Sequence, residues 1–510
     1  MLVKLFSGAV NGIEATTITL EINILNGAQF IIVGLPDNAV KESQQRIDSA
    51  LREIGSRIPG RRVIINMAPA DVKKEGSSYD LPLCIGILAA NEQLPADELA
   101  DFILLGELSL DGSLVAVKGV LPVAIHAHNE GFKNIIVPLE NANEAAVVGG
   151  LNVYGFQHLR EVVRFLSHQK SMTPFIFHPD EQGNVGDSFF DFKDVKGQES
   201  VKRALEIAAA GAHNLIMVGP PGSGKTMLAR RLPGILPPMT IEESLETTKI
   251  HSVAGKLSRS CSLITARPFR SPHHTISNIA LIGGGTFPHP GEISLATNGV
   301  LFLDELPEFQ RSVLEVMRQP LEDRKITISR ARYSVDYPAN FMLIASMNPC
   351  PCGYYNHPTR ECNCNEGAVQ HYLSKISGPL LDRIDIHIEV VPVELDKITG
   401  HQEAECSDTI RQRVIAARRI QTERFKAFPG IHCNAQMNPA LLKKYCPLDS
   451  QSIALLKMAM QKFGLSARAY DRIVKLARTI ADLEASACIL SRHIAEAIQY
   501  RSLDRESWGT

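Results

Sequence analysis

The segment GPPGSGKT has the residue types and the spacing of a phosphate-binding loop. Its glycines allow successive backbone N–H groups to turn toward one anion, and the helix expected after it adds a positive N-terminal end. Lys225 is placed to reach the β and γ phosphates, and Thr226 is placed to ligate magnesium. The alternative is an ordinary glycine turn, but the apolar strand expected before the loop and the helix after it favour a nucleotide site. The predicted phosphate loop consists of Gly219, Pro220, Pro221, Gly222, Ser223, Gly224, Lys225 and Thr226.

Two adjacent carboxylates follow the apolar run GVLFL. Asp304 can hold hydrated magnesium, and Glu305 can orient an attacking water. A solvated acidic strand end is the alternative interpretation of the pair. Together with the phosphate loop, the pair predicts a nucleoside triphosphatase in which Thr226 and Asp304 bind Mg²⁺ and Glu305 acts in catalysis.

Four of the ten cysteines are crowded into one short stretch, NPCPCGYYNHPTRECNC. Cys350, Cys352, Cys362 and Cys364 have the pattern C-x-C-x9-C-x-C, and four thiolates can enclose a tetrahedral zinc ion with no open position. The one-residue spacings are tighter than the usual two to four, so reduced thiols and disulfides remain alternatives. A bound zinc would brace a long loop, and its role would be structural.

The composition limits the class of protein. The chain has 510 residues and a net charge of −2, so any contact with nucleic acid must come from local basic patches. The apolar run LPLCIGILAA (81–90) is well short of the ~20 residues that cross a bilayer, and the N-terminal apolar block is too short for a signal peptide. The sequence therefore predicts a cytoplasmic protein without a membrane partner.

The elements that position these residues fall into successive segments. Short β-like runs alternate with helical runs over 1–165, which predicts a first α/β domain. Proline, glycine and polar residues over 166–188 predict a linker. A second α/β domain is predicted over 189–395, and amphipathic helical runs predict a helical domain over 396–510.

Four nearly all-apolar runs in the second α/β domain predict strands that are covered on both faces. HNLIMVG (213–219) leads into the phosphate loop, and GVLFLDE (299–305) ends at the two carboxylates. FMLIASMN (341–348) precedes the cysteines, and IDIHIEVV (384–391) is expected to close the sheet. The strands would bring the loop, the carboxylates and Asn348 to one region.

These motifs resemble those of the AAA+ family, in its magnesium-chelatase-like branch. The resemblance implies a central parallel-sheet ATPase domain with a helical lid, and ATP and Mg²⁺ as cofactors. SMNPC places Asn348 at the family's sensor 1, where it would hold the attacking water or the γ-phosphate. SGPLLDRIDIH (377–387) resembles the arginine-finger segment, so Arg383 would reach the neighbouring subunit's γ-phosphate. Without that motif, Arg383 beside Asp382 is more typical of a surface ion pair.

Two further assignments depend on the same resemblance. LSARAYDRI (465–473) resembles the sensor 2 helix of the lid, so Arg468 is expected to contact phosphate, with Arg472 as the alternative. DFKDVKGQESVKRAL (191–205) resembles the segment that packs on the adenine, with Val195, Lys196 and Gly197 as candidates. Because an arginine finger acts in trans, the resemblance implies a ring, usually a homo-hexamer.

The stretch RPFRSPHHTISNIALIGGGTFPHPGEISLATNGVLFLDELPEF (267–309) is similar to the ComM (YifB) competence family, and the order of segments along the whole chain fits that family. The resemblance implies a hexameric DNA helicase, acting on single-stranded and branched DNA, that drives branch migration during natural transformation. A chelatase-type remodeller of a protein partner and a regulatory protease are alternatives from other classes.

The first domain, 1–165, resembles the α/β fold of the Lon protease domain (S5 type). In that resemblance Ser78 overlies the nucleophile, but the lysine position is held by Leu121, and Lys118 is displaced by three residues. A serine without its base is not activated. We therefore expect an inactive scaffold that makes contacts with a partner, with DNA or with another subunit.

The basic segment RKITISRARYSVDYP (324–338) predicts a hairpin before the Asn348 strand. The resemblance implies that it faces the pore of a ring, where Lys325, Arg330 and Arg332 would neutralise DNA phosphates. A solvated hairpin is the alternative. His273 and His274, in a glycine-rich insert, could be metal ligands, although polar contacts are the commoner role for such a pair.

Overall fold

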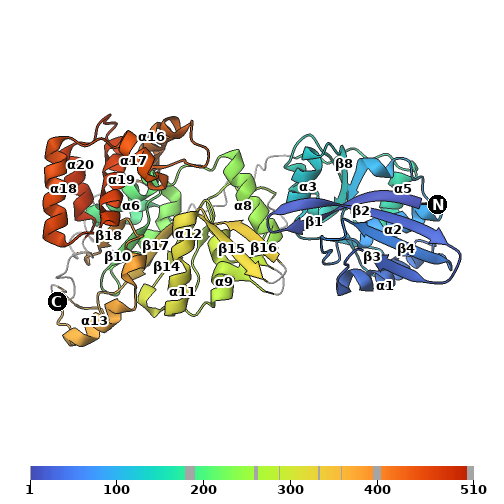
Figure 1. Cartoon of the computed structure of the whole chain (residues 1–510), viewed down its shortest axis with the longest axis horizontal. Coiled ribbons are helices and arrows are strands. Elements are labelled where there is room, and N and C mark those ends of the chain that lie inside the picture. Colours follow the sequence, from blue (N-terminus) through green and yellow to red (C-terminus); the bar gives the residue numbers. More distant parts are fainter. Residues whose placement is uncertain are drawn as a thin grey trace. The chain divides into compact units, whose positions relative to one another are not determined.

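The computed structural model describes residues 2–177, 190–257, 262–285, 288–330, 333–355, 357, 359–393 and 404–501 (Figure 1). The chain forms two compact units. Unit 1 comprises Met1–Gly183, Ile241–Ile264 and Pro288–Pro290; unit 2 comprises Asn184–Thr240, Thr265–Phe287 and Gly291–Thr510. Within the described part of the chain, no helix combines the length and the apolar character that a bilayer span needs.

Unit 1 contains a seven-stranded mixed sheet in the order β3-β4-β2-β1-β5-β8-β9. Its strands are β1 (Leu2–Asn11), β2 (Glu14–Leu25), β3 (Phe30–Val33), β4 (Arg62–Ala68), β5 (Phe102–Leu104), β8 (Asn134–Pro138) and β9 (Asn152–Phe156). The strands β6 (Glu107–Leu108) and β7 (Leu114–Val115) form a separate small hairpin, and β13 (His289–Pro290) also belongs to this unit. The long β1 pairs antiparallel with β2 along its whole length. Its residues come from the N-terminal apolar block, which the sequence did not identify as a strand.

Helices cover both faces of this sheet. They are α1 (Asn38–Glu53), α2 (Asp80–Ala90), α3 (Val120–Asn129), α4 (Leu139–Ala146) and α5 (Leu159–Leu166). Residues of α1, α2 and α5 share one buried cluster with the sheet, and residues of α3 and α4 share another. Every residue of α2 is buried, and all of them except Asp80 are apolar, as expected for a helix that is covered all round.

An additional helix of unit 1, α8 (Ile241–Val253), comes from the middle of the chain. Its Ser252 hydroxyl donates to Glu144 Oε1 at 2.5 Å, and Lys249 lies 3.6 Å from a carboxylate oxygen of Glu14. Gly255 follows with φ +65°, and a Cβ there would lie 2.6 Å from Lys118 Cε. The segment after the phosphate-loop helix is therefore packed on the first α/β fold, which the sequence did not predict.

The structure describes the first part of the predicted linker, up to residue 177. The N–H of Phe175 donates to the Val153 carbonyl at 2.7 Å, and Phe175 and Phe177 pack against the apolar cluster of α3 and α4. These two aromatic side chains attach the first part of 166–188 to unit 1, whereas 178–188 lie outside the described residues. The predicted domain bounds stay predictions.

Unit 2 is built on a five-stranded parallel sheet with the order β11-β14-β17-β10-β18. Its strands are β10 (Leu215–Val218), β11 (Phe269–Arg270), β14 (Val300–Leu303), β17 (Met342–Met347) and β18 (Ile386–Glu389). The four strands predicted from apolar runs are confirmed, with β18 at the expected edge. The edge strand β11 was missed because two residues are too few to show a pattern.

Short helices and a hairpin surround this sheet. They are α6 (Glu199–Gly211), α7 (Lys225–Arg231), α9 (Asn278–Ile282), α10 (Glu292–Leu295), α11 (Arg311–Val316), α12 (Arg318–Asp323), α13 (Glu366–Ser374) and α14 (Gly378–Leu381). The short strand β12 (Gly283–Gly284) follows α9. The predicted basic hairpin is confirmed as the antiparallel pair β15 (Lys325–Arg330) and β16 (Tyr333–Pro338).

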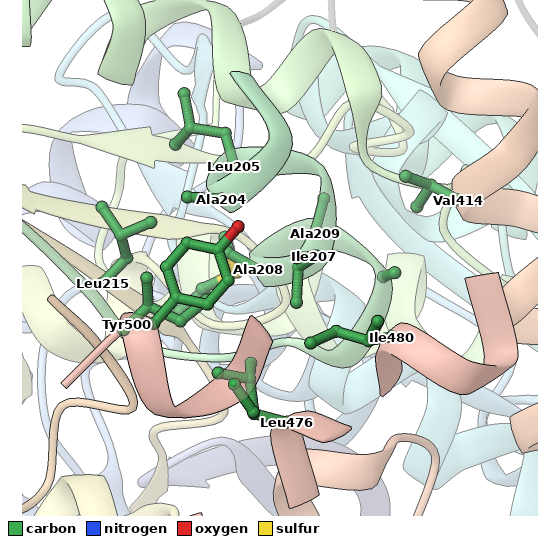
Figure 2. Packing of buried hydrophobic residues seen from close by; sticks show 14 of the residues in the cluster. Ala204, Leu205, Ile207, Ala208, Ala209, Leu215, Val414, Leu476, Ile480 and Tyr500 are labelled. Atoms are coloured by element: carbon green, nitrogen blue, oxygen red, sulfur yellow. The ribbon is translucent and has the colours of Figure 1, made fainter. Parts of the chain in front are cut away.

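The helical lid packs on the alanine-rich helix α6 (Figures 1 and 2). Its helices are α16 (Ser407–Phe425), α17 (Pro439–Tyr445), α18 (Ser450–Phe463), α19 (Ala467–Leu483) and α20 (Ser491–Gln499). Figure 2 shows Leu476 and Ile480 of α19 beside α6, where the small Ala204, Ala208 and Ala209 side chains allow close approach. Lid and sheet thus share one core.

A buried ionic group also joins the lid to the sheet. The Asp385 carboxylate accepts from Arg472 of α19 at 2.7 Å, from the Asn214 N–H at 3.1 Å, and lies 3.3 Å from His213 Nδ1. Burial acts to raise the pKa of Asp385, but Arg472 and the hydrogen bond from His213 outweigh burial and hold the pKa below its usual value. The carboxylate is therefore charged and fully partnered.

We expect Asp385→Ala to destabilise unit 2 by about 3–5 kcal/mol, because Arg472 loses its partner in a buried site. Urea unfolding and amide exchange in α19 measure the effect. Asp336→Ala, which removes the exposed partner of Lys325, is the matched control and should cost less than about 1 kcal/mol.

The effect should depend on pH. Because the folded pKa lies below the unfolded value of about 3.9, the stabilisation is complete above that pH and is lost as the pH falls through the folded pKa. An equal loss of stability in the two variants at pH 7 would contradict the prediction.

Candidate nucleotide-binding site

The phosphate loop connects β10 to α7, as predicted. The Gly219 N–H donates to the Met347 carbonyl at 3.2 Å, so the loop begins beside the end of β17. The Ser223 hydroxyl donates to the Pro220 carbonyl at 2.8 Å, which closes the loop on itself. Gly224 has φ +91° directly before the helix, a conformation in which a side chain would be strained.

The Lys225 ammonium is held over this loop. It donates to the carbonyls of Gly219 at 2.7 Å and Pro220 at 2.8 Å, and to the side-chain oxygen of Asn348 at 3.2 Å. Burial lowers the pKa of Lys225, and the charge of Asp304 partly opposes that shift. The lysine and the predicted sensor asparagine therefore meet, although 123 positions separate them.

The expected magnesium ligands are adjacent. The Thr226 hydroxyl donates to Asp304 Oδ2 at 2.7 Å. Asp304 Oδ1 accepts from the Ser346 hydroxyl and from the Glu305 N–H, the latter at 3.1 Å. A hydroxyl and a carboxylate oxygen are the donors that Mg²⁺ prefers, so this pair fits the ion. Ser346 was not predicted, because a serine inside an apolar strand gives no signal of its own.

Glu305 projects from the same strand end. Its backbone is left-handed, with φ +54°, and its side chain is 56% exposed. His274 Nδ1 lies 3.6 Å from Glu305 Oε2, and the His273 ring lies against His274 with centroids 4.0 Å apart. The sequence left His273 and His274 open as metal ligands or polar contacts. In the structure His274 is a polar neighbour of Glu305, the candidate catalytic carboxylate.

The backbone of Asn348 is held by a residue of α13. Its N–H donates to the hydroxyl of Tyr372 on α13, and burial raises the pKa of that hydroxyl. Tyr372 was not predicted, because an aromatic residue on a helix is ordinarily part of a core. The asparagine is therefore fixed both through its side chain and through its backbone.

The segment expected near the adenine, residues 191–205, contacts the phosphate loop. Val195 is buried, and Gly197 has φ +65°. The side chain of the next residue, Gln198, donates to the carbonyls of Ser223 at 3.3 Å and Val391 at 2.8 Å. Gln198, which sequence reasoning missed, ties this segment to the phosphate loop. The roles of Val195 and Gly197 stay predictions.

The structure does not bring Arg383 to the phosphate loop of its own chain. The guanidinium, only 6% exposed, lies 2.5 Å from Glu322 Oε1 on α12 and donates to the Pro379 carbonyl at 2.5 Å. It lines a cavity of about 480 Å³ that Arg318 and Glu315 also border. Its role in a neighbouring subunit stays a prediction.

The two lid arginines differ. Arg472 is bound to Asp385, whereas Arg468 is exposed at the start of α19. Over the residues that the structure describes, Arg468 makes no hydrogen bond or ion pair. Neither arginine is placed at the phosphate loop, and their contact with phosphate remains a prediction.

The basic hairpin is only partly described. Lys325 pairs with Asp336 across the two strands at 3.2 Å, and Thr327 donates to the same carboxylate at 2.6 Å. This pairing compensates the Lys325 charge. The side chain of Arg330 and all of Arg332 lie outside the described residues. Binding of DNA by these three residues stays a prediction.

The four clustered cysteines do converge. Cys350, Cys352, Cys362 and Cys364 each offer a sulfur, and these atoms all lie within 4.8 Å of one another. All four are free thiols, so the structure contains no disulfide among them. The donor set is one that can hold a soft metal ion.

The structure places the residues that the resemblance to a serine–lysine protease singled out in unit 1. Leu121 is fully buried, and its N–H donates to Glu144 Oε1 at 2.9 Å. Lys118 is exposed and extends toward Gly255. Among the described residues, no hydrogen bond joins the Ser78 hydroxyl to a base. The inactivity of this domain stays a prediction.

Comparisons with known proteins cover nearly the whole chain. The description "Magnesium chelatase, subunit ChlI" matches residues 191–398, and its C-terminal counterpart matches 404–501. "Subunit ChlI of Mg-chelatase" matches residues 20–141.

Individual relatives agree with these matches. Competence protein ComM of Haemophilus influenzae is 45% identical over 98% of this chain and 97% of its own length. Uncharacterized protein YifB of Escherichia coli is 42% identical over 98% of this chain and 96% of its own length. Lon protease 2 of Bacillus subtilis is 30% identical over 31% of this chain and 33% of its own length.

We expect Lys225→Ala to weaken binding of a nucleoside triphosphate about 10- to 100-fold, because it removes one charge-assisted contact worth about 1.5–3 kcal/mol. Titration of a fluorescent ATP analogue in the presence of Mg²⁺ measures the change. Lys325→Ala, another lysine-to-alanine change, should leave the affinity unaltered. Equal affinity of wild type and Lys225→Ala would exclude this loop as the nucleotide site.

Proposed function

Because the chain belongs to the ComM/YifB family of magnesium-chelatase-like AAA+ proteins, we propose that it is an ATP-hydrolysing, hexameric ring motor that moves DNA. In this proposal it acts as a helicase that promotes branch migration of incoming DNA during natural transformation. The observation that carries it is the convergence of Lys225, Asn348 and the Thr226–Asp304 pair at one edge of the parallel sheet.

The residues at this edge divide the chemistry of ATP hydrolysis among them. Lys225 neutralises charge on the β and γ phosphates, while Thr226 and Asp304 hold Mg²⁺, which supplies further charge neutralisation when bound. Glu305 orients the attacking water; its side chain is 56% exposed and has His274 as a polar neighbour. Asn348, fixed beside Lys225, holds the water or the γ-phosphate.

Arg383 is proposed to complete the site of a neighbouring subunit. Its contacts lie on α12 and α14 of its own chain, away from its own phosphate loop, and it borders a polar cavity. A charge supplied in trans makes hydrolysis depend on assembly. This dependence, together with the family membership, supports a ring.

In this proposal the conformational change that accompanies ATP hydrolysis is transmitted to DNA by the basic hairpin β15–β16. The hairpin lies between α12 and β17, and β17 leads directly to Asn348. Lys325, Arg330 and Arg332 would contact DNA phosphates, single-stranded or at a branch point, without reading the sequence. The name of the Haemophilus influenzae relative, a competence protein, supports a role in transformation.

A chelatase-type remodeller of a protein partner is the second candidate. It is favoured by the matches to magnesium chelatase subunit ChlI in three regions of the chain. In that case hydrolysis would respond to the protein partner and not to DNA.

We expect single-stranded DNA to raise the ATPase rate severalfold, and the effect to decline as salt increases from 50 to about 200 mM. Phosphate contacts release counterions, which gives the salt dependence. The rate of phosphate release with and without DNA measures it, and Glu305→Gln, which removes the catalytic carboxylate, gives the background. Indifference to DNA at every salt concentration would favour the remodeller.

We expect two inactive variants to restore activity when mixed. Lys225→Ala lacks a phosphate loop lysine but keeps Arg383, and Arg383→Ala keeps the loop but lacks the finger. In mixed rings, about one quarter of the seams would join an intact loop to an intact arginine.

The recovered rate in a 1:1 mixture measures this complementation. A mixture of Lys225→Ala with Glu305→Gln is the control, since both lesions lie in the same half-site and no seam is repaired. No recovery in the first mixture, despite assembly, would place Arg383 outside the shared site.

A further inference from the structure

The four clustered cysteines are arranged as the ligands of one metal ion. The Sγ atoms of Cys350 and Cys352 are 3.3 Å apart, those of Cys350 and Cys362 are 3.7 Å apart, and those of Cys352 and Cys362 are 3.5 Å apart. A tetrahedral zinc with Zn–S bonds of 2.3 Å separates its sulfurs by about 3.8 Å. The observed separations are therefore close to those around a single ion.

Backbone donors surround these sulfurs. The N–H of Cys364 donates to Cys362 Sγ at 3.4 Å, and the N–H groups of Tyr354 and Asn363 are directed at the sulfur of Cys352. The Gly353 N–H closes a tight turn on the Cys350 carbonyl at 3.0 Å. Such hydrogen bonds fix the orientation of thiolate ligands.

The alternatives fit less well. A disulfide needs sulfurs about 2.05 Å apart, and all four thiols are free. Three of the four are only half-buried, so the group is not a set of thiols packed in an apolar core. An iron–sulfur cluster places several atoms between its thiolates, whereas these four sulfurs lie within 4.8 Å of one another.

We propose that Cys350, Cys352, Cys362 and Cys364 bind one structural Zn²⁺, and that this metal clip holds the sensor asparagine and the phosphate loop in register. With four protein ligands the ion has no open position, so it supplies no chemistry of its own. The clip joins the end of β17 to the start of α13 across a loop of nine residues between its two ligand pairs.

The clip is in contact with the candidate nucleotide site in two places. Cys350 is two residues beyond Asn348, whose backbone is also held by Tyr372 of α13. A Cβ at Gly353 would lie 2.6 Å from Pro221 Cδ, so the cysteine loop rests directly on the phosphate loop. Fixing both ends of this loop limits the motion of Asn348 relative to Lys225.

Metal content tests the site itself. The full chain, purified without chelator, should contain about one zinc and no iron per chain by elemental analysis. The double variant Cys362→Ser/Cys364→Ser should contain almost none. The matched control Cys406→Ser/Cys488→Ser, which removes two thiols outside the cluster, should keep the metal.

Cobalt gives a second measurement on the wild-type chain, in case the variant does not fold. Chain loaded with Co²⁺ should show the strong near-ultraviolet charge-transfer bands of four thiolate ligands, and added Zn²⁺ should abolish them. A wild-type chain that contains no zinc and takes up no cobalt would overturn the proposal. So would metal that persists in Cys362→Ser/Cys364→Ser, or iron in place of zinc.

The second half of the proposal rests on the proposed ATPase. Loss of the clip should lower kcat for ATP at least tenfold and change the affinity for the ATP analogue much less, since the clip positions Asn348 more than it positions Lys225. If the affinity fell by the same factor as kcat, the clip would stabilise the whole site and would not act specifically on the position of Asn348, which would contradict this half of the proposal. Because metal content does not depend on hydrolysis, a chain without ATPase activity would still decide whether zinc is bound.

Discussion

The candidate site depends on the register of a parallel sheet that is buried on both faces. Val218 of β10 stands opposite Met347 of β17, and Leu303 of β14 stands opposite Ala345. The strands therefore end together, and the residues that follow them must leave the sheet at one edge. Lys225, Asp304 and Asn348 meet for this reason. A slip of one strand by one residue would separate them and would turn each of its side chains to the opposite face of the sheet.

The segment before β18 connects Arg383 with the helical lid. Arg383 and Asp385 are two residues apart, directly before β18. Arg383 is held by Glu322 of α12, and Asp385 by Arg472 of α19. A rotation of the lid that displaces α19 would therefore act on the segment that carries Arg383.

The sequence predicted those features that depend on local pattern. Apolar runs identified four of the five strands of the second sheet. The spacing of the glycines identified the phosphate loop, whose carbonyl at Gly219 accepts a hydrogen bond from Lys225. Partners that join distant segments could not be predicted. Gln198, Ser346 and Tyr372 each contact the site through one hydrogen bond set by the fold, and a glutamine, a serine or a tyrosine gives no signal alone. Glu322 was missed for the same reason.

The helix α8 packs on the first α/β fold beside the residues that the protease resemblance singled out. In the fold's resemblance to a protease, Leu121 occupies the place of a lysine, and its N–H is bound by Glu144. Glu144 also binds Ser252 of α8, and Lys118 packs beside Gly255. The surface beside Leu121 and Lys118 is thus covered by α8 and the residues that follow it. The chain enters α8 from unit 2 and returns to unit 2 after it, so this segment of unit 1 is flanked in the sequence by segments of unit 2.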